Sequence, residues 1–171
     1  MRSEPSIVVA TEADLPGIAE LAGVIWRACY PGVISTEQIE YMLARMYAPE
    51  TLRHELREQG IVFYRLLEEG GLAGFASLGP TETPAVMKLH KLYLRPELHG
   101  RGLGTVLLRH CADEARRFGA RRLILAVNRR NTRAQAAYQR NGFVVVDAVV
   151  ADIGGGFVMD DFVMAKELGS K

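Results

Sequence analysis

The sequence predicts a single layered domain of mixed α/β (α+β) class. The chain has 171 residues, which is close to the usual size of one domain. Of these residues, 49% are hydrophobic and 24% are charged, as in ordinary globular proteins. Some segments carry hydrophobic residues at helical spacing, whereas others are short β-branched or alternating runs, and the two kinds are interspersed. That mixture is typical of helices packed on a sheet.

The first third of the chain predicts one strand followed by helices. The β-branched run over 6–10 predicts the strand. Apolar residues at helical spacing then predict a helix over about 12–28. A capping box beginning at Ser35 starts a second helix that includes Met46. Pro49 fits the first turn of a further short helix.

The middle of the chain predicts three strands. Residues 61–67 and 72–78 form a hairpin joined by a glycine-containing turn. The run over 87–94 alternates strictly, so its two faces should have different environments. One predicted face carries Met87, Leu89, Lys91 and Tyr93, and the other carries Lys88, His90, Leu92 and Leu94.

The last part predicts two helices and three strands. A helix over 103–118 precedes a buried strand over 121–127, and a short helix covers 132–141. Two closing strands, 143–152 and 157–168, are joined by three glycines. The longer helix is expected to turn Val106, Leu107, His110, Cys111 and Ala115 inward.

Composition excludes several classes of protein. The formal net charge of +1 argues against a protein that binds nucleic acid through a basic face. Cys29 and Cys111 are too few and too far apart for a disulfide framework or a zinc site, so no metal is expected. The chain has no long apolar run and no leader-like start, so we expect a cytoplasmic protein without a membrane partner.

A glycine-rich turn between a predicted strand and a predicted helix carries the strongest functional signal. Gly100, Gly102 and Gly104 occupy alternate positions there. Glycine allows close approach of a ligand to the backbone, and a helix N-terminus offers unpaired N–H groups to a phosphate. The spacing fits neither a Walker A loop nor a dinucleotide fingerprint, because Thr105 stands where the latter needs glycine. A tight turn without a ligand is the alternative.

Two motifs together resemble the GNAT superfamily of N-acetyltransferases. The run His99-Gly100-Arg101-Gly102-Leu103-Gly104 resembles its pyrophosphate loop, Arg/Gln-x-x-Gly-x-Gly/Ala. Asn128, Asn131, Tyr138 and Gly142-Phe143 follow in the order of its second motif. His99 departs from the usual Gln or Arg, which leaves Arg101 as the side chain expected to meet a phosphate.

The resemblance implies a fold, a co-substrate and a set of binding residues. It implies one N-acetyltransferase domain over 1–171, with a mostly antiparallel central sheet and helices on both faces. Acetyl-CoA would be the co-substrate, with its pantetheine arm along the backbone of Leu92, Tyr93 and Leu94 and no metal required. The pyrophosphate would lie on the turn of His99, Gly100, Arg101, Gly102, Leu103, Gly104 and Thr105. Asn131 would cap the following helix and reach the cofactor.

The resemblance also implies catalytic roles for two side chains. Tyr138 would be the acid near the departing thiolate; the alternative is a tyrosine that only packs. His90 is the candidate general base, because related arylalkylamine acetyltransferases place a histidine on the corresponding strand and imidazole titrates near neutral pH. The alternatives are a histidine merely held in the sheet, or proton removal by ordered water.

Four further segments resemble the bacterial PaiA-like branch of this superfamily, some members of which acetylate polyamines. They are residues 30–32, 38–43, 88–94 and 153–161. A small amine arrives as a cation, so its pocket should offer negative charge or aromatic faces. Tyr30, Tyr41, Asp160 and Asp161 are the candidate contacts, and alternation should send the two aspartates to opposite faces. Solvated or packing roles are the alternatives. The competing functions are protein N-terminal or lysine acetylation and non-catalytic acetyl-CoA binding, in a monomer or a homodimer.

Overall fold

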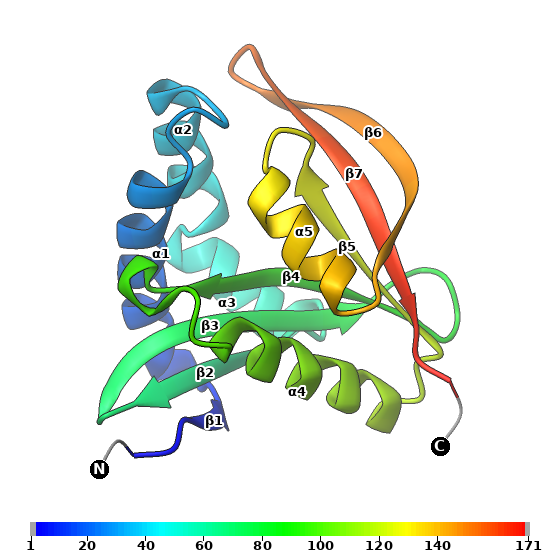
Figure 1. Cartoon of the computed structure of the whole chain (residues 1–171). Coiled ribbons are helices and arrows are strands. Elements are labelled where there is room, and N and C mark those ends of the chain that lie inside the picture. Colours follow the sequence, from blue (N-terminus) through cyan, green and yellow to red (C-terminus); the bar gives the residue numbers. More distant parts are fainter. Residues whose placement is uncertain (1–2, 170–171) are drawn as a thin grey trace.

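A computed structural model describes residues 3–169, which form one seven-stranded sheet in the order β1-β2-β3-β4-β5-β7-β6 (Figure 1). The predicted domain also includes residues 1–2 and 170–171, which lie outside the described residues. The strands are β1 (Ser6–Val9), β2 (Val62–Glu68), β3 (Gly71–Pro80), β4 (Val86–Leu94), β5 (Arg122–Asn128), β6 (Val144–Gly154) and β7 (Phe157–Glu167). The helices are α1 (Leu15–Cys29), α2 (Thr36–Met46), α3 (Pro49–Glu58), α4 (Leu103–Arg117) and α5 (Thr132–Arg140), with short 3-10 turns η1 (Glu12–Asp14) and η2 (Pro96–Leu98).

The sheet is mostly antiparallel, as predicted, and has one parallel pair. Strands β4 and β5 are parallel and pair only through Val86–Lys88 and Arg122–Ile124. Beyond those residues β4 stays paired with β3, and β5 stays paired with β7. The two strands therefore diverge and open a gap in the middle of the sheet, which Figure 1 shows between β4 and β5.

Helices cover both faces of the sheet, which confirms the predicted architecture. One hydrophobic cluster joins α1, α2 and α3 to the sheet and includes Trp26, Phe63 and Phe75. A second joins α4 to the opposite face and includes Leu107 and Leu123. Helix α5 lies over β5 beside the gap (Figure 1). We call these the α1–α3 face and the α4–α5 face.

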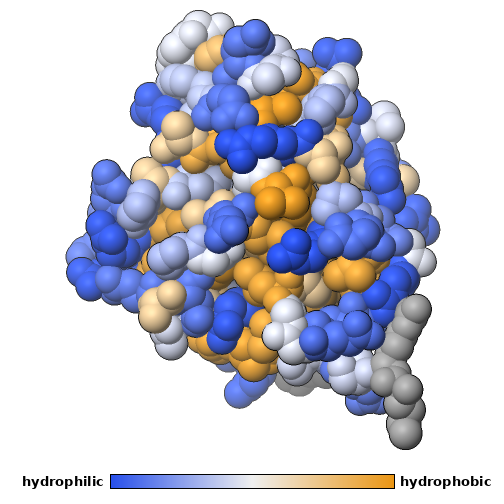
Figure 2. All heavy atoms as spheres, turned by 90° about the vertical axis from the view of Figure 1, so that its left-hand side faces the viewer, coloured by the Kyte–Doolittle hydropathy of each residue, from blue (hydrophilic) through white to orange (hydrophobic). Residues whose placement is uncertain are grey.

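The side of the molecule formed by α1 and α2 is not uniformly polar. Figure 2 shows hydrophobic side chains in a band across this side, bounded by hydrophilic ones. The turn that joins β4 to α4 also lies on this side in Figure 1, and its η2 segment contacts α1. Among residues 3–169, no helix is both long and apolar enough to span a bilayer.

Helix α4 buries a different stripe from the one predicted. Leu107, Cys111 and Ala115 are buried as expected, but Val106 is 42% exposed. Leu108 is buried instead. At about 100° per residue, the buried stripe includes Leu107 and Cys111, and Val106 lies roughly 120° from the midpoint between these two, which turns it outward.

Strand β4 breaks its predicted alternation at a bulge. Ser77 of β3 pairs with Lys91 while Leu78 pairs with Leu89, so His90 is an extra residue. Leu89 consequently packs on the α4–α5 face together with Leu92, although strict alternation put those two leucines on opposite faces. The sequence alone carries no signal for this bulge.

Candidate functional site

The glycine turn has the geometry expected of an anion cradle. Gly100 and Gly102 have φ angles of +82° and +80°, a region that favours glycine, and a Cβ on either would meet only open space. Helix α4 begins directly after Gly102, and no side chain caps that end. The first N–H groups of α4 are therefore available to a phosphate.

Leu94 at the end of β4 sets the distance between the sheet and this turn. A Cβ added to Gly104 would lie 3.4 Å from Cδ1 of Leu94, and one added to Gly74 of β3 would lie 2.7 Å from Cδ2. Both glycines thus make room for the leucine. Nε2 of His99 lies 3.2 Å from the carbonyl oxygen of Leu94, so the His99 ring is folded back onto the strand end.

Arg101 does not stand free in the turn. Its guanidinium forms a two-pronged ion pair with Glu68 at the end of β2, with Nη1 donating to Oε2 at 3.0 Å. The sequence predicts that Arg101 contacts a phosphate, but in the structure its guanidinium is already paired with the carboxylate of Glu68.

The backbone of Leu92–Leu94 lies along the gap between β4 and β5. Leu92 packs on the α4–α5 face, whereas Tyr93 is partly buried against the α1–α3 face. The Tyr93 hydroxyl lies 3.2 Å from the hydroxyl of Tyr30. Trp26 packs against both rings, with centroid distances of 4.7 Å to Tyr30 and 5.8 Å to Tyr93. An aromatic wall therefore lines the α1–α3 side of the gap.

Tyr138 on α5 approaches the gap from the other side. Its ring packs on the core of the α4–α5 face, 5.8 Å between centroids from Phe143. Burial raises the pKa of the Tyr138 hydroxyl well above its usual value, and the Tyr30 hydroxyl adds to the rise. At neutral pH the Tyr138 hydroxyl is therefore protonated.

The two asparagines of the second motif order the start of α5. Oδ1 of Asn131 accepts a hydrogen bond from the Ala134 N–H at 3.2 Å, which makes Asn131 the N-cap. Oδ1 of Asn128 accepts from the Arg130 N–H at 2.9 Å. Both amide oxygens thus serve the local backbone.

His90 lies on a different face from the one predicted. A Cβ on Gly79 would lie 3.3 Å from Nε2 of His90 and 2.8 Å from Cγ1 of Ile61, a member of the α1–α3 cluster. The bulge has turned the ring to the α1–α3 face and over β3, so His90 does not share the face of Leu92. Burial lowers the pKa of His90 to about 4, and Lys88 and Lys91 add to the decrease.

Asp161 is nearly buried on β7, only 8% exposed, and it forms no ion pair with any residue in 3–169. Burial raises the pKa of its carboxyl, and Asp160 adds to the rise while Lys88 opposes it. On β7, Met159 packs on the α1–α3 face and Phe162 on the α4–α5 face, so strand alternation places Asp161 on the α1–α3 face with the aromatic wall. The charge of Asp161 adds to the rise that burial causes in the pKa of Tyr30. Asp160 instead pairs with Arg129, 2.8 Å from Nε to Oδ1.

Tyr41 on α2 holds the tip of the β6–β7 hairpin. Its hydroxyl donates to the carbonyl oxygen of Ile153 at 2.8 Å and accepts from Nη1 of Arg45 at 2.8 Å. A Cβ on Gly155 would lie 2.7 Å from the Tyr41 ring, so the glycine tip is what allows this contact. The sequence predicts that Tyr41 contacts the amine substrate, but its hydroxyl is hydrogen-bonded to the hairpin.

Sequence reasoning missed two buried carboxylate contacts. One is Glu68 at Arg101; the other is Glu55 of α3, whose Oε1 lies 3.0 Å from Nζ of Lys91. Lys91 also lies over the ring of Tyr47, 5.5 Å from its centroid. The position of Lys91 within an apolar strand was the one sequence signal for such a contact, because a buried ammonium group requires a partner of opposite charge.

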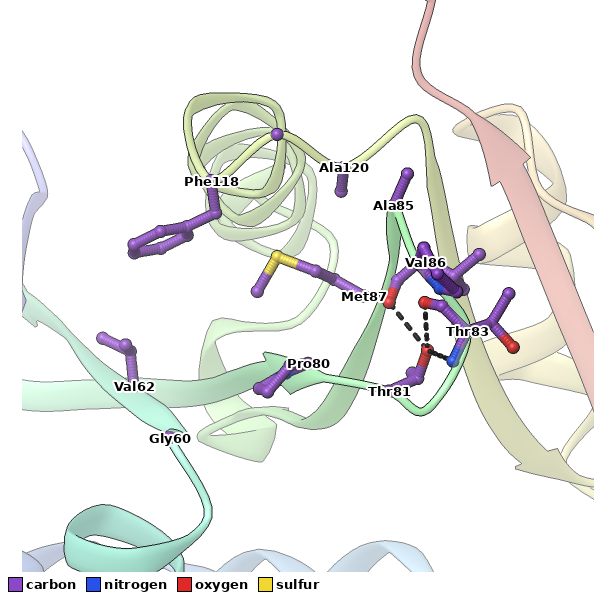
Figure 3. A pocket seen from close by; sticks show the side chains of 12 residues that line it. Gly60, Val62, Pro80, Thr81, Thr83, Ala85, Val86, Met87, Phe118 and Ala120 are labelled. Carbon is purple, nitrogen blue, oxygen red and sulfur yellow. Dashed lines mark hydrogen bonds between the residues drawn. The ribbon is translucent and has the colours of Figure 1, made fainter.

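A cavity of about 480 Å³ lies away from this site, at the C-terminal end of α4. Figure 3 shows its walls, which include Phe118, Met87 and Pro80. The Thr81 hydroxyl beside it donates to the carbonyl oxygen of Val86 at 2.8 Å and offers a ligand no free donor. Within residues 3–169, no group of His, Cys, Asp and Glu is placed to hold a metal.

The split parallel pair, the glycine turn at a helix N-terminus and the tyrosine beside the split are arranged as the resemblance to the GNAT superfamily implies. The model of the acetyltransferase (GNAT) family matches residues 23–143, and the chain belongs to that family. It is an N-acetyltransferase by family.

One relative by sequence and two solved structures are similar to this chain over most of its length. The spermidine N(1)-acetyltransferase of Thermoplasma acidophilum is 31% identical over 151 residues, covering 86% of this chain and 90% of that protein. The crystal structure of the PaiA N-acetyltransferase from Thermoplasma acidophilum in complex with coenzyme A has a TM-score of 0.81 and 27% identity, covering 96% of this chain and 99% of that one. The ribosomal-protein alanine N-acetyltransferase of Escherichia coli shares the fold, with a TM-score of 0.71 and 22% identity over 98% of this chain and 96% of that one.

Proposed function

We propose that this protein transfers the acetyl group of acetyl-CoA to a primary amine of a small cationic, polyamine-like acceptor. The observation that carries the proposal is Asp161, a nearly buried carboxylate that forms no salt bridge among residues 3–169 and has Lys88 only as a nearby charge. A buried charge is costly unless it is paired, and an ammonium group would pair it. The similar spermidine acetyltransferase supports an amine of this class.

The chain supplies binding and proton transfer at either side of the gap. Acetyl-CoA supplies the acetyl group as a thioester. The N–H groups that follow Gly102 face its pyrophosphate, and the backbone of Leu92–Leu94 lines the path of its arm. On the α1–α3 face, Asp161 and the ring of Tyr30 hold the amine for direct attack. Tyr138 gives its proton to the departing sulfur.

His90 remains the predicted general base, but its pKa in the folded protein is lower than the ordinary value of a histidine. Because the pKa of His90 is lowered to about 4, the imidazole is neutral throughout the range above pH 5. We therefore expect no limb of kcat/KM near 6.5 and, with His90 as base, a limb near pH 4 that His90→Gln removes. A pH–rate profile of both proteins between pH 3.5 and 9 checks this. Superimposable acid limbs would assign proton removal to water.

Asp161→Asn is expected to weaken acceptor binding while stabilising the fold. The variant keeps the side-chain shape but removes the charge that pairs with the amine, so KM for the best amine should rise by about tenfold or more. The raised pKa of Asp161 means that its ionised form costs folding free energy at neutral pH. The Tm of Asp161→Asn at neutral pH should therefore lie above that of the wild type.

The assay uses spermidine, spermine, an aromatic amine, free amino acids and an N-terminal peptide as acceptors. Asp160→Asn is the matched control, because Asp160 pairs with Arg129 and should leave KM unchanged. Acetylation of the peptide alone, or an unchanged KM in Asp161→Asn, contradicts the small-cation proposal and favours protein acetylation. Binding of acetyl-CoA with no turnover on any acceptor would favour a non-catalytic module.

A further inference from the structure

Both arginine side chains of the segment between β4 and α4 are turned toward the β2–β3 hairpin. Nε of Arg95 donates to the carbonyl oxygen of Leu72 at 2.7 Å. Arg101, six residues later, is held by both oxygens of Glu68. The hairpin lies on the β3 side of β4, whereas the gap lies on the β5 side. The positive charge of the turn is therefore directed away from the gap.

Glu68 is placed to fix the position of Arg101. The Glu68 side chain is only 7% exposed and that of Arg101 is 32% exposed, so the pair is partly shielded from solvent. A two-pronged carboxylate–guanidinium contact fixes the plane as well as the position of the guanidinium. Arg101 lies between the two left-handed glycines, Gly100 and Gly102, so holding its side chain restrains the most adaptable part of the backbone.

Other contacts make the same hairpin the support of the whole turn. The Arg95 N–H donates to the carbonyl oxygen of Ala73 at 2.9 Å. Beneath it, Ala73 and Leu66 of the hairpin form a small buried cluster with Leu94 and Leu103. The turn thus contacts the hairpin through apolar side chains, a backbone hydrogen bond and the Glu68–Arg101 ion pair.

We infer that Glu68 is a positioning residue: by holding Arg101 it preorganises the backbone N–H groups of the turn for the pyrophosphate, and Arg101 itself makes no phosphate contact. The inference rests on the proposed use of acetyl-CoA. In this inference the role of Arg101 is to restrain the turn, whereas the sequence motif suggests that Arg101 contacts a phosphate. Preorganised donors bind an anion more tightly because less conformational freedom is lost on binding.

Glu68→Gln tests the inference, because it keeps the shape of the side chain and removes its charge. We expect the Kd for coenzyme A, measured by titration calorimetry, to rise by about tenfold, the factor that one hydrogen bond to a charged group typically supplies. Transfer from acetyl-pantetheine, a donor without pyrophosphate, should be unchanged. Glu114→Gln is the matched control, since it disrupts the ion pair with Arg117 on α4. Tm values verify folding.

The charge-swapped double variant, Glu68→Arg with Arg101→Glu, distinguishes an Arg101 that restrains the turn from an Arg101 that binds a phosphate. It should restore coenzyme A affinity to near the wild-type value, because the ion pair is rebuilt with reversed polarity. A phosphate-binding Arg101 predicts the reverse: tighter binding in Glu68→Gln and loss of binding in the swap. Either of those results, or an unchanged Kd in Glu68→Gln, overturns the inference. Failure of the wild type to bind coenzyme A would instead contradict the proposed function itself.

Discussion

Replacement of Tyr138 by phenylalanine is expected to lower kcat by roughly 10²-fold, within the usual range for loss of a general acid. The variant keeps the ring and hence its contact with Phe143 at 5.8 Å, so the fold and the KM for acetyl-CoA should change little. The hydroxyl can serve as the donor because burial raises its pKa and keeps it protonated over the working pH range. Steady-state kinetics with the best amine of the acceptor panel provides the measurement.

Tyr64→Phe is a suitable control for this experiment. Burial also raises the pKa of the Tyr64 hydroxyl, but Tyr64 lies on β2 against His110 of α4, away from the gap. Removal of that hydroxyl should leave kcat near the wild-type value. If Tyr138→Phe turns over at the wild-type rate, Tyr138 only packs and another group, or water, protonates the sulfur.

Substitutions in the glycine turn are expected to weaken acetyl-CoA binding by about 10- to 100-fold, the loss of one charge-assisted hydrogen bond or slightly more. Gly102→Ala acts through the backbone, because the φ angle of +80° strains any residue with a Cβ although space is open around it. Gly104→Val acts through contact, because its branches would press on Leu94, 3.4 Å from the added Cβ. Titration calorimetry with coenzyme A measures both effects.

Gly17→Ala on α1 is the matched glycine-to-alanine control. A Cβ at Gly17 meets nothing within 4 Å, and the residue lies within a regular helix, so alanine should be neutral or slightly stabilising. If Gly102→Ala folds normally and binds coenzyme A with unchanged affinity, the turn is a structural element and not a phosphate cradle.

The sequence by itself determined the class of the protein and the order of its elements. Periodicity is a local property, so the strands and helices could be located within a few residues of their observed ends. The glycine turn and the motif from Asn128 to Phe143 are likewise local, because each consists of a few neighbouring residues at fixed spacing. The family match over 23–143 confirmed the class that these two motifs indicated.

Only the tertiary structure decided which side chains meet. A single extra residue in β4 turned His90 away from the face of Leu92, and no neighbouring residue in the sequence signals that bulge. The pairing of Arg101 with Glu68 spans 33 positions, and the hold of Tyr41 on the hairpin spans 112. Asp160 and Asp161 are adjacent and chemically identical, yet Asp160 pairs with Arg129 whereas Asp161 is nearly buried and forms no salt bridge among the described residues. These differences arise from burial and from partners distant in the chain, which local patterns do not encode.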